Sequence, residues 1–185
     1  MTPHVCPWWL GYFLASPIRK FAQNPTRILE PYVIQGMTSL DIGPGMGFFT
    51  LPIARLTGEK GRVIAIDIQD RMLASLRRRA ARAGLQDRIE TRVCTDSSLG
   101  IDDLTGTIDF ALTFAVLHEL PDMKRTITEI HRALKPGGQL LIAEPIGHVR
   151  KTTFAETMNI VTSIGFETIA TPSIRRTHAA LVRKK

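Results

Sequence analysis

TSLDIGPGMGFFT, residues 38–50, is the stretch that decides the fold of this chain. Residues 38–42 form a short segment that we interpret as a buried strand, and a helical pattern of apolar residues resumes at Phe48. Between them stand Gly43, Gly45 and Gly47. Glycine adopts positive φ without steric cost, and the first N–H groups of a helix lack partners within the helix. A strand, a glycine turn and a helix in this order predict a site for a nucleotide-like ligand.

Strand-like and helix-like segments alternate along the chain that follows this stretch. Their order predicts a parallel sheet with helices on both faces. The tail differs, because residues 165–170 and 177–182 form two short apolar runs that predict a closing antiparallel pair of strands. The other expected strands are 38–43, 62–67, 89–94, 108–114 and 139–144, and the expected helices are 48–57, 70–83, 122–134 and 152–164.

The composition indicates a single globular domain. A chain of 185 residues with 44% hydrophobic residues can bury a sizeable core but has no room for a second full domain. The net charge of +7 fits either an anionic partner or a basic, soluble surface. Cys6 and Cys94 lie far apart without any CxxC spacing, so we expect no disulfide framework, no metal site and a reducing, cytoplasmic location.

Residues 5–18 form an aromatic and almost wholly apolar segment near the N-terminus. This segment is shorter than the roughly 20 residues that span a bilayer, and Arg19 and Lys20 follow it instead of preceding it as in a signal peptide. We therefore expect no transmembrane segment. We expect residues 1–36 to form a cap that packs on the core, closes over a pocket or touches lipid, and residues 37–185 to form the main domain. The aromatic side chains available for lipid contact are Trp8, Trp9, Tyr12 and Phe13.

The glycine spacing and two acidic residues restrict the ligand. Dinucleotide-binding enzymes use GxGxxG, which requires a small residue where this chain has Phe48. Asp67 closes the strand VIAID, and Asp96 follows the strand RVC. Ligands of open α/β sheets bind at the carboxyl ends of the strands, so we expect both carboxylates to lie beside the glycine turn.

At this point the chain resembles the class I S-adenosylmethionine-dependent methyltransferases. The resemblance includes Asp41 to Gly47, Asp67, Asp96 and the blocks IDFALTFAVLHELPD, residues 108–122, and HRALKPGGQLLIAEP, residues 131–145. It is closest to the small-molecule branch that includes quinone-ring and arsenite methyltransferases. The resemblance implies one Rossmann-like α/β domain with a seven-stranded sheet in the order 3-2-1-4-5-7-6, whose last strand is antiparallel.

The resemblance also implies a role for each matching residue in binding S-adenosylmethionine. Asp67 would accept hydrogen bonds from both ribose hydroxyls, and Asp96 would meet the adenine amino group. Asp41 would lie near the ammonium end of the methionine part, although a structural hydrogen bond is an equal alternative for it. The remaining positions are Gly43, Gly45 and Gly47 along the methionine part, Ile68 with Cys94 or Thr95 beside the adenine ring, and Thr113 and Phe114 near the sulfonium.

A general base is required only if the methyl acceptor must lose a proton. The candidates are His118, after the fourth strand, and Glu144 and His148, around the end of the fifth. For His118 we favour a structural or cofactor-lining role over that of a base. His148 is the less constrained candidate.

The acceptor is expected to be a small and lipophilic molecule. Many methyltransferases that act on amino groups of nucleic-acid bases carry Asn/Asp-Pro-Pro-Tyr/Phe after the fourth strand, where this chain reads TFAV, residues 113–116. This departure weighs against a nucleic-acid partner. Arsenite methyltransferases carry a set of several cysteines, whereas this chain has two that lie far apart. This difference weighs against arsenite as the acceptor. The alternatives are an RNA methyltransferase, a binding protein without catalysis and an NAD-dependent oxidoreductase.

Overall fold

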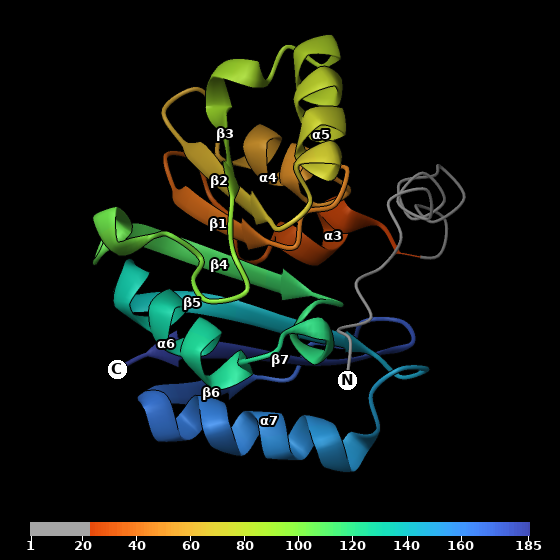
Figure 1. Ribbon diagram of the computed structural model, residues 1–185, viewed down its shortest axis with the longest axis vertical. Helices are drawn as coiled ribbons and strands as arrows, with labels where there is room; N and C mark the ends of the chain where they lie inside the picture. Colours follow the sequence, from red (N-terminus) through yellow and green to blue (C-terminus); the bar gives the residue numbers. More distant parts are fainter. Residues whose placement is uncertain (1–22) are drawn as a thin grey trace.

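The computed structural model describes residues 23–185, which contain a seven-stranded sheet in the order β3-β2-β1-β4-β5-β7-β6 (Figure 1). Neighbouring strands from β3 to β5 are parallel, whereas β7 runs antiparallel to both β5 and β6. The predicted strand order and the closing antiparallel pair are confirmed. The strands are β1 Thr38–Ile42, β2 Arg62–Asp67, β3 Ile89–Val93, β4 Ile108–Phe114, β5 Leu134–Pro145, β6 Phe166–Ala170 and β7 Thr177–Lys184.

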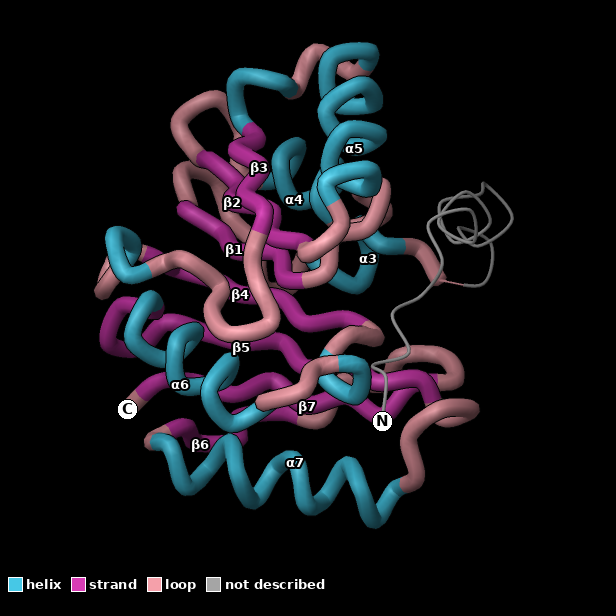
Figure 2. Tube along the Cα trace, viewed as in Figure 1, coloured by secondary structure: helices cyan, strands magenta, loops and turns pink. Residues whose placement is uncertain are grey.

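Helices cover both faces of the sheet, as Figure 2 shows. Alternate residues of a strand point to opposite faces, so Val63 and Ala65 of β2 join one hydrophobic cluster while Ile64 and Ile66 join the other. The first cluster includes side chains of α3, α4 and α5, and the second includes side chains of α6 and α7. These helices are α3 Pro25–Leu29, α4 Thr50–Leu56, α5 Asp70–Arg82, α6 Met123–Ala133 and α7 Lys151–Ile164.

The position of β1 determines where a ligand can bind. The chain proceeds from β1 to β2 and β3 on one side and then returns to place β4 on the other side of β1. Loops that follow β1 and β4 therefore diverge at the carboxyl ends of these strands, which is where open α/β sheets bind their ligands. The glycine turn directly follows β1 at this point.

Several boundaries differ from the sequence-based expectations. Helix α4 begins at Thr50 instead of Phe48, because residues 45–49 form a turn before it. Strand β5 begins at Leu134, because this residue pairs with Ile108 ahead of a register shift. Three short 3-10 helices were not predicted from the sequence: η1 Gln86–Arg88, η2 Asp102–Leu104 and η3 Leu117–Glu119.

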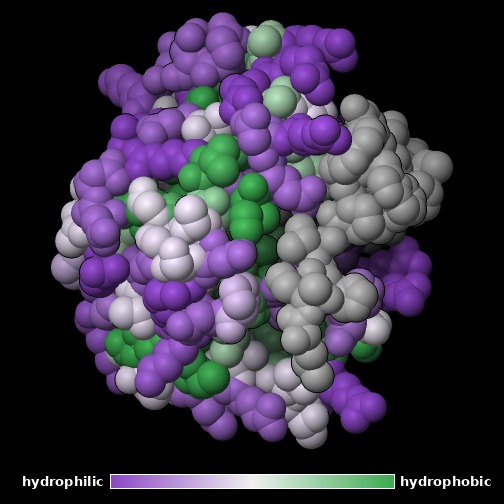
Figure 3. Space-filling view, in the orientation of Figure 1, coloured by the Kyte–Doolittle hydropathy of each residue, from purple (hydrophilic) through white to green (hydrophobic). Residues whose placement is uncertain are grey.

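Residues 1–22 of the expected cap, with the aromatic side chains available for lipid contact, lie outside the described residues, whereas residues 23–36 are described and contain α3. Within residues 23–185, no helix combines the length and the apolar character that crossing a bilayer demands. Most of the face seen in Figure 3 is hydrophilic, with hydrophobic side chains gathered near its middle.

Candidate active site

The glycine turn owes its shape to close packing on two sides. Gly43, Gly45 and Gly47 all have positive φ, at 68°, 54° and 87°. A Cβ at Gly43 would lie 2.6 Å from Val116 Cγ2, and one at Gly47 would overlap the side chain of Leu76. A Cβ at Gly45 would have no atom of residues 23–185 within 4 Å. The turn therefore packs against protein at its two ends and presents open space at Gly45.

Asp67 lies against this open part of the turn. Its carboxylate accepts hydrogen bonds from Gly45 N at 3.2 Å and from Gln69 N at 2.9 Å, and the residue is only 9% exposed. Burial raises the pKa of the Asp67 carboxyl, and the backbone N–H groups of Gln69, Gly45 and Ile68 oppose that shift. A carboxylate offers about four acceptor positions, so these N–H groups do not occupy all of them. The structure thus brings Asp67 and the glycine turn together, as the sequence predicted.

Asp41 occupies a different environment, beneath the turn. Its carboxyl group is buried and accepts a hydrogen bond from Thr50 Oγ1 at 2.6 Å, which links β1 to the first residue of α4. Burial raises the pKa of Asp41 to about 7, the bond from Thr50 opposes this shift, and the nearby charge of Asp67 adds to it. A hydrogen bond within the protein fits a structural role for Asp41, which was the alternative to contact with the ammonium end of the methionine part.

The third group of predicted residues follows β2 and β3. Ile68 is 39% exposed directly after Asp67. Cys94 is half-buried, and burial raises the pKa of its thiol to about 11, so the thiol is neutral at physiological pH. Thr95 and Asp96 are exposed in a turn closed by hydrogen bonds between Thr95 and Ser98. An apolar side chain, a neutral thiol and an accessible carboxylate therefore face solvent from adjacent strand ends.

At the ends of β4 and β5 the structure joins the three candidate catalytic residues. Glu144 is 2% exposed, and its carboxylate accepts from Leu117 N at 2.9 Å and also bonds His118 Nδ1. This bond raises the pKa of His118. The ring of His148 lies 5.4 Å from that of His118, nearly perpendicular to it. Glu144 fixes the imidazole so that its Nε2 points away from the buried carboxylate.

Residues at the end of β4 include two features that a ligand could use. Thr113 is fully buried, and its hydroxyl has no hydrogen-bond partner among residues 23–185. Phe114 packs on Phe49, with ring centroids 4.4 Å apart. The next residue, Ala115, has φ of 59°, and its N–H donates to Ala143 O at 2.7 Å. Nothing in the sequence indicated this unusual backbone conformation, because alanine rarely adopts it.

The sequence-based prediction also missed Glu129 of α6. This carboxylate is buried against the loop that follows β3, where it accepts a hydrogen bond from Leu99 N. The available signal was its place in the helix, between Ile127 and Ile130 on the apolar stripe.

The strand order, together with a glycine turn beside a strand-ending carboxylate, defines a Rossmann-like α/β domain. Residues 34–172 match the family model described as a methyltransferase domain, and the chain belongs to that family.

Curated relatives and solved structures agree with this assignment. The chain is 34% identical over 112 residues to the ubiquinone/menaquinone biosynthesis C-methyltransferase UbiE of Klebsiella pneumoniae, covering 60% of this chain and 44% of that protein. The corresponding protein of Brucella anthropi is 31% identical over 116 residues, with 63% and 43% covered. The chain thus spans less than half the length of these relatives.

Among solved structures, a SAM-dependent methyltransferase from Aquifex aeolicus has a TM-score of 0.85 at 23% identity, covering 97% of this chain and 98% of that one. The [4+2]-cyclase SpnF has a TM-score of 0.74 at 19% identity, with 87% and 80% covered. At these identities the likeness shows the fold alone.

Proposed function

We propose that this protein transfers a methyl group from S-adenosylmethionine to a small, lipophilic acceptor. The observation that carries the proposal is the contact between Gly45 N and the Asp67 carboxylate, beside the open space at Gly45. A ribose diol can donate two hydrogen bonds to the acceptor positions that Asp67 keeps. The fit of the site to an adenosyl ligand therefore rests on a carboxylate that is already fixed by backbone N–H groups.

The other donor-side residues complete this site. Ile68 and Thr95 would flank the adenine ring, and Asp96 would accept from its amino group. Thr113 and Phe114 would lie near the sulfonium, at the end of β4. S-adenosylmethionine supplies an electrophilic methyl group on a good leaving group. The protein mainly has to orient the acceptor, and orientation can contribute about 7–11 kcal/mol to catalysis.

The acceptor half of the site is proposed around His118. An acceptor that loses a proton needs a base, and Glu144 holds His118 Nδ1 so that Nε2 is the atom available to remove it. Ile146 is 54% exposed between the end of β5 and His148, which gives this region an apolar contact surface. The relatives named C-methyltransferases of quinone biosynthesis fit such an acceptor, since a carbon atom that receives a methyl group must give up a proton.

Ligand-dependent stability tests the donor half of this proposal. S-adenosylhomocysteine at about 100 times its Kd should stabilise the protein by about 2.7 kcal/mol, measured as a rise in Tm, and NAD should not. Stabilisation by NAD alone would refute the proposal and favour an oxidoreductase.

Methyl transfer tests the acceptor half. With a labelled donor, we expect label in hydroxylated aromatic or quinol compounds and none in RNA. Labelled RNA would instead support the RNA methyltransferase alternative, and donor binding without transfer to any compound of a broad metabolite extract would support a binding protein.

A further inference from the structure

We infer that Glu129 and Arg125 of α6 position the β3–η2 loop, residues 94–101, and thereby set the recognition of the adenine amino group. The inference rests on the proposed function, because it assigns Asp96 of this loop to adenine. Neither residue touches the proposed ligand. Both would act through the loop, so they are positioning residues.

Glu129 forms the inner part of this contact. It is 5% exposed, and its Oε2 accepts hydrogen bonds from Leu99 N at 2.7 Å and from Ser98 Oγ at 3.3 Å. A buried carboxylate is expensive unless hydrogen bonds satisfy it, and a buried N–H that loses its acceptor is costly as well. The bond between Glu129 and Leu99 therefore favours one position of the loop relative to α6.

Arg125 forms the outer part of the contact, one helical turn earlier. Its guanidinium donates to the carbonyl oxygen of Asp96, and its Nε lies 3.9 Å from Glu129 Oε1. The two α6 side chains thus hold the loop at Asp96 and at Leu99, on either side of the turn. Figure 1 shows the loop descending from β3 across the front of the sheet towards α6.

The loop is anchored on the sheet at its start, where Cys94 N donates to Asp67 O at 3.1 Å, and by the buried side chains of Leu99 and Ile101. Thr95 and Ser98 bond each other, at 3.0 and 3.4 Å, which gives the turn its shape. The contacts from α6 tie that turn to the rest of the domain. The Asp96 carboxylate can accept a hydrogen bond from the adenine amino group only when the two are held within hydrogen-bond distance. Loss of the α6 contacts should therefore weaken adenine recognition while the Asp67 side of the site is retained.

A double-mutant cycle on the full chain tests this coupling. Binding of S-adenosylhomocysteine is measured by calorimetry for the wild type, Glu129→Leu, Asp96→Ala and the double variant; leucine removes the acceptor that Leu99 N and Ser98 Oγ use, whereas glutamine would keep one. We expect Glu129→Leu to weaken binding about tenfold when Asp96 is present and less than about twofold in the Asp96→Ala background. An equal loss in both backgrounds, or no loss in either, would overturn the inference.

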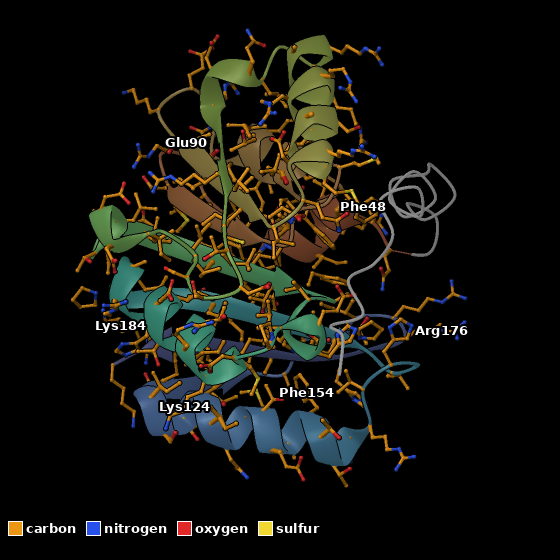
Figure 4. The ribbon with its side chains drawn as sticks, in the orientation of Figure 1. Phe48, Glu90, Lys124, Phe154, Arg176 and Lys184 are labelled. Atoms are coloured by element: carbon orange, nitrogen blue, oxygen red, sulfur yellow. The ribbon has the colours of Figure 1, made fainter. Side chains whose placement is uncertain are left out.

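Adjacent residues of α6 provide a matched control that does not disturb the core. Lys124 is exposed at the start of α6 (Figure 4), and Lys124→Ala removes the same charge as Arg125→Ala. Only Arg125→Ala should weaken binding, again through Asp96, and this pair of variants decides the question if Glu129→Leu fails to fold. Equal affinities of the two variants would overturn the role of Arg125.

An analogue separates adenine recognition from general damage. S-inosylhomocysteine carries an oxygen in place of the adenine amino group, so the wild type should prefer S-adenosylhomocysteine, and Glu129→Leu should lose most of this preference. An unchanged preference would overturn the inference while leaving the proposed function standing. A wild type that binds neither compound would refute the proposed function itself.

Discussion

Asp67→Asn is the substitution that most directly tests the donor site. It keeps the size of the side chain but removes the charge, and its amide offers one carbonyl oxygen where Gly45 N and Gln69 N now use two carboxylate oxygens. One of these N–H groups would face an amide NH₂. The carbonyl oxygen of the amide can accept a hydrogen bond from a backbone N–H or from a ribose hydroxyl, but it cannot accept fully from both.

The size of the effect follows from the hydrogen bonds at stake. A hydrogen bond to a charged group contributes about 1.5–3 kcal/mol, and a neutral acceptor about half as much. Loss of the charge from two ribose contacts should therefore cost about 1.5–3 kcal/mol, or a roughly 10- to 140-fold rise in Kd at about 1.4 kcal/mol per factor of ten. Folding should change less, because removal of a buried charge offsets part of the lost backbone bonding.

Calorimetric titration with S-adenosylhomocysteine measures this directly, at about pH 8 so that the carboxyl group is ionised. Asp41→Asn is the matched control, since it neutralises the neighbouring buried carboxyl but can still accept from Thr50. We expect less than a threefold change for Asp41→Asn by the same conversion. A Kd for Asp67→Asn within threefold of the wild type would refute the assignment of Asp67 to the ribose.

Three further predictions concern pH, catalysis and the turn. The pKa of Asp41 is raised from 3.8 to about 7, so between these pH values the folded state binds a proton that the unfolded state has released. The contribution of Asp41 to stability is therefore lost as pH rises from about 4 to about 7. The free energy of unfolding from urea titrations should depend less steeply on pH for Asp41→Asn, and an unchanged pH dependence would contradict this. His118 must be neutral to act as a base, so the rate of methyl transfer should fall at low pH. Glu144→Gln should lower both kcat and the pKa of this acidic limb of the pH–rate profile, because it changes the bond that raises the pKa of His118. An acidic limb with an unchanged pKa would exclude His118 as the group observed. Gly47→Ala should destabilise the fold by about 1–3 kcal/mol, because its Cβ meets Leu76 at positive φ. Gly45→Ala has the strain of positive φ but meets no atom of residues 23–185, so it should destabilise the fold less than Gly47→Ala and weaken cofactor binding more. Equal losses of Tm in the two variants would disprove the open face at Gly45.

Much of the fold could be predicted because its signals are local or belong to a family motif. Buried parallel strands often contain short apolar runs, as in β2, and their alternation with helices limits the topology. The order of the strands came from the resemblance to a known family. The start of α4 was misplaced by two residues, since a glycine turn and a helical first turn have similar sequences.

The donor site was predictable for the same reason, because its groups follow strand ends that converge in any sheet of this kind. The bond between Asp67 and Gly45 joins residues 22 apart in sequence, yet both positions follow from the motif. The roles of these residues in binding stay predictions.

The contacts between distant side chains could not be predicted in this way. His118 and Glu144 were separate candidates, and only the folded structure shows that they bond each other. Glu129 looked like one residue of an amphipathic helix, although its partner Leu99 lies 30 residues away. Such pairs form where a loop packs on a helix, and the spacing of residues in the sequence does not indicate which side chains meet there.

The backbone conformation of Ala115 has a consequence for the order in which the site is assembled. A positive φ costs alanine roughly 1 kcal/mol, and the bond from its N–H to Ala143 O of β5 helps to offset that cost. This bond can exist only after β4 and β5 have paired. The reversal of the chain at Ala115 leads into η3, where Leu117 N reaches Glu144. The slow hydrogen exchange expected at Leu117 should therefore develop during refolding only once β4 and β5 are joined.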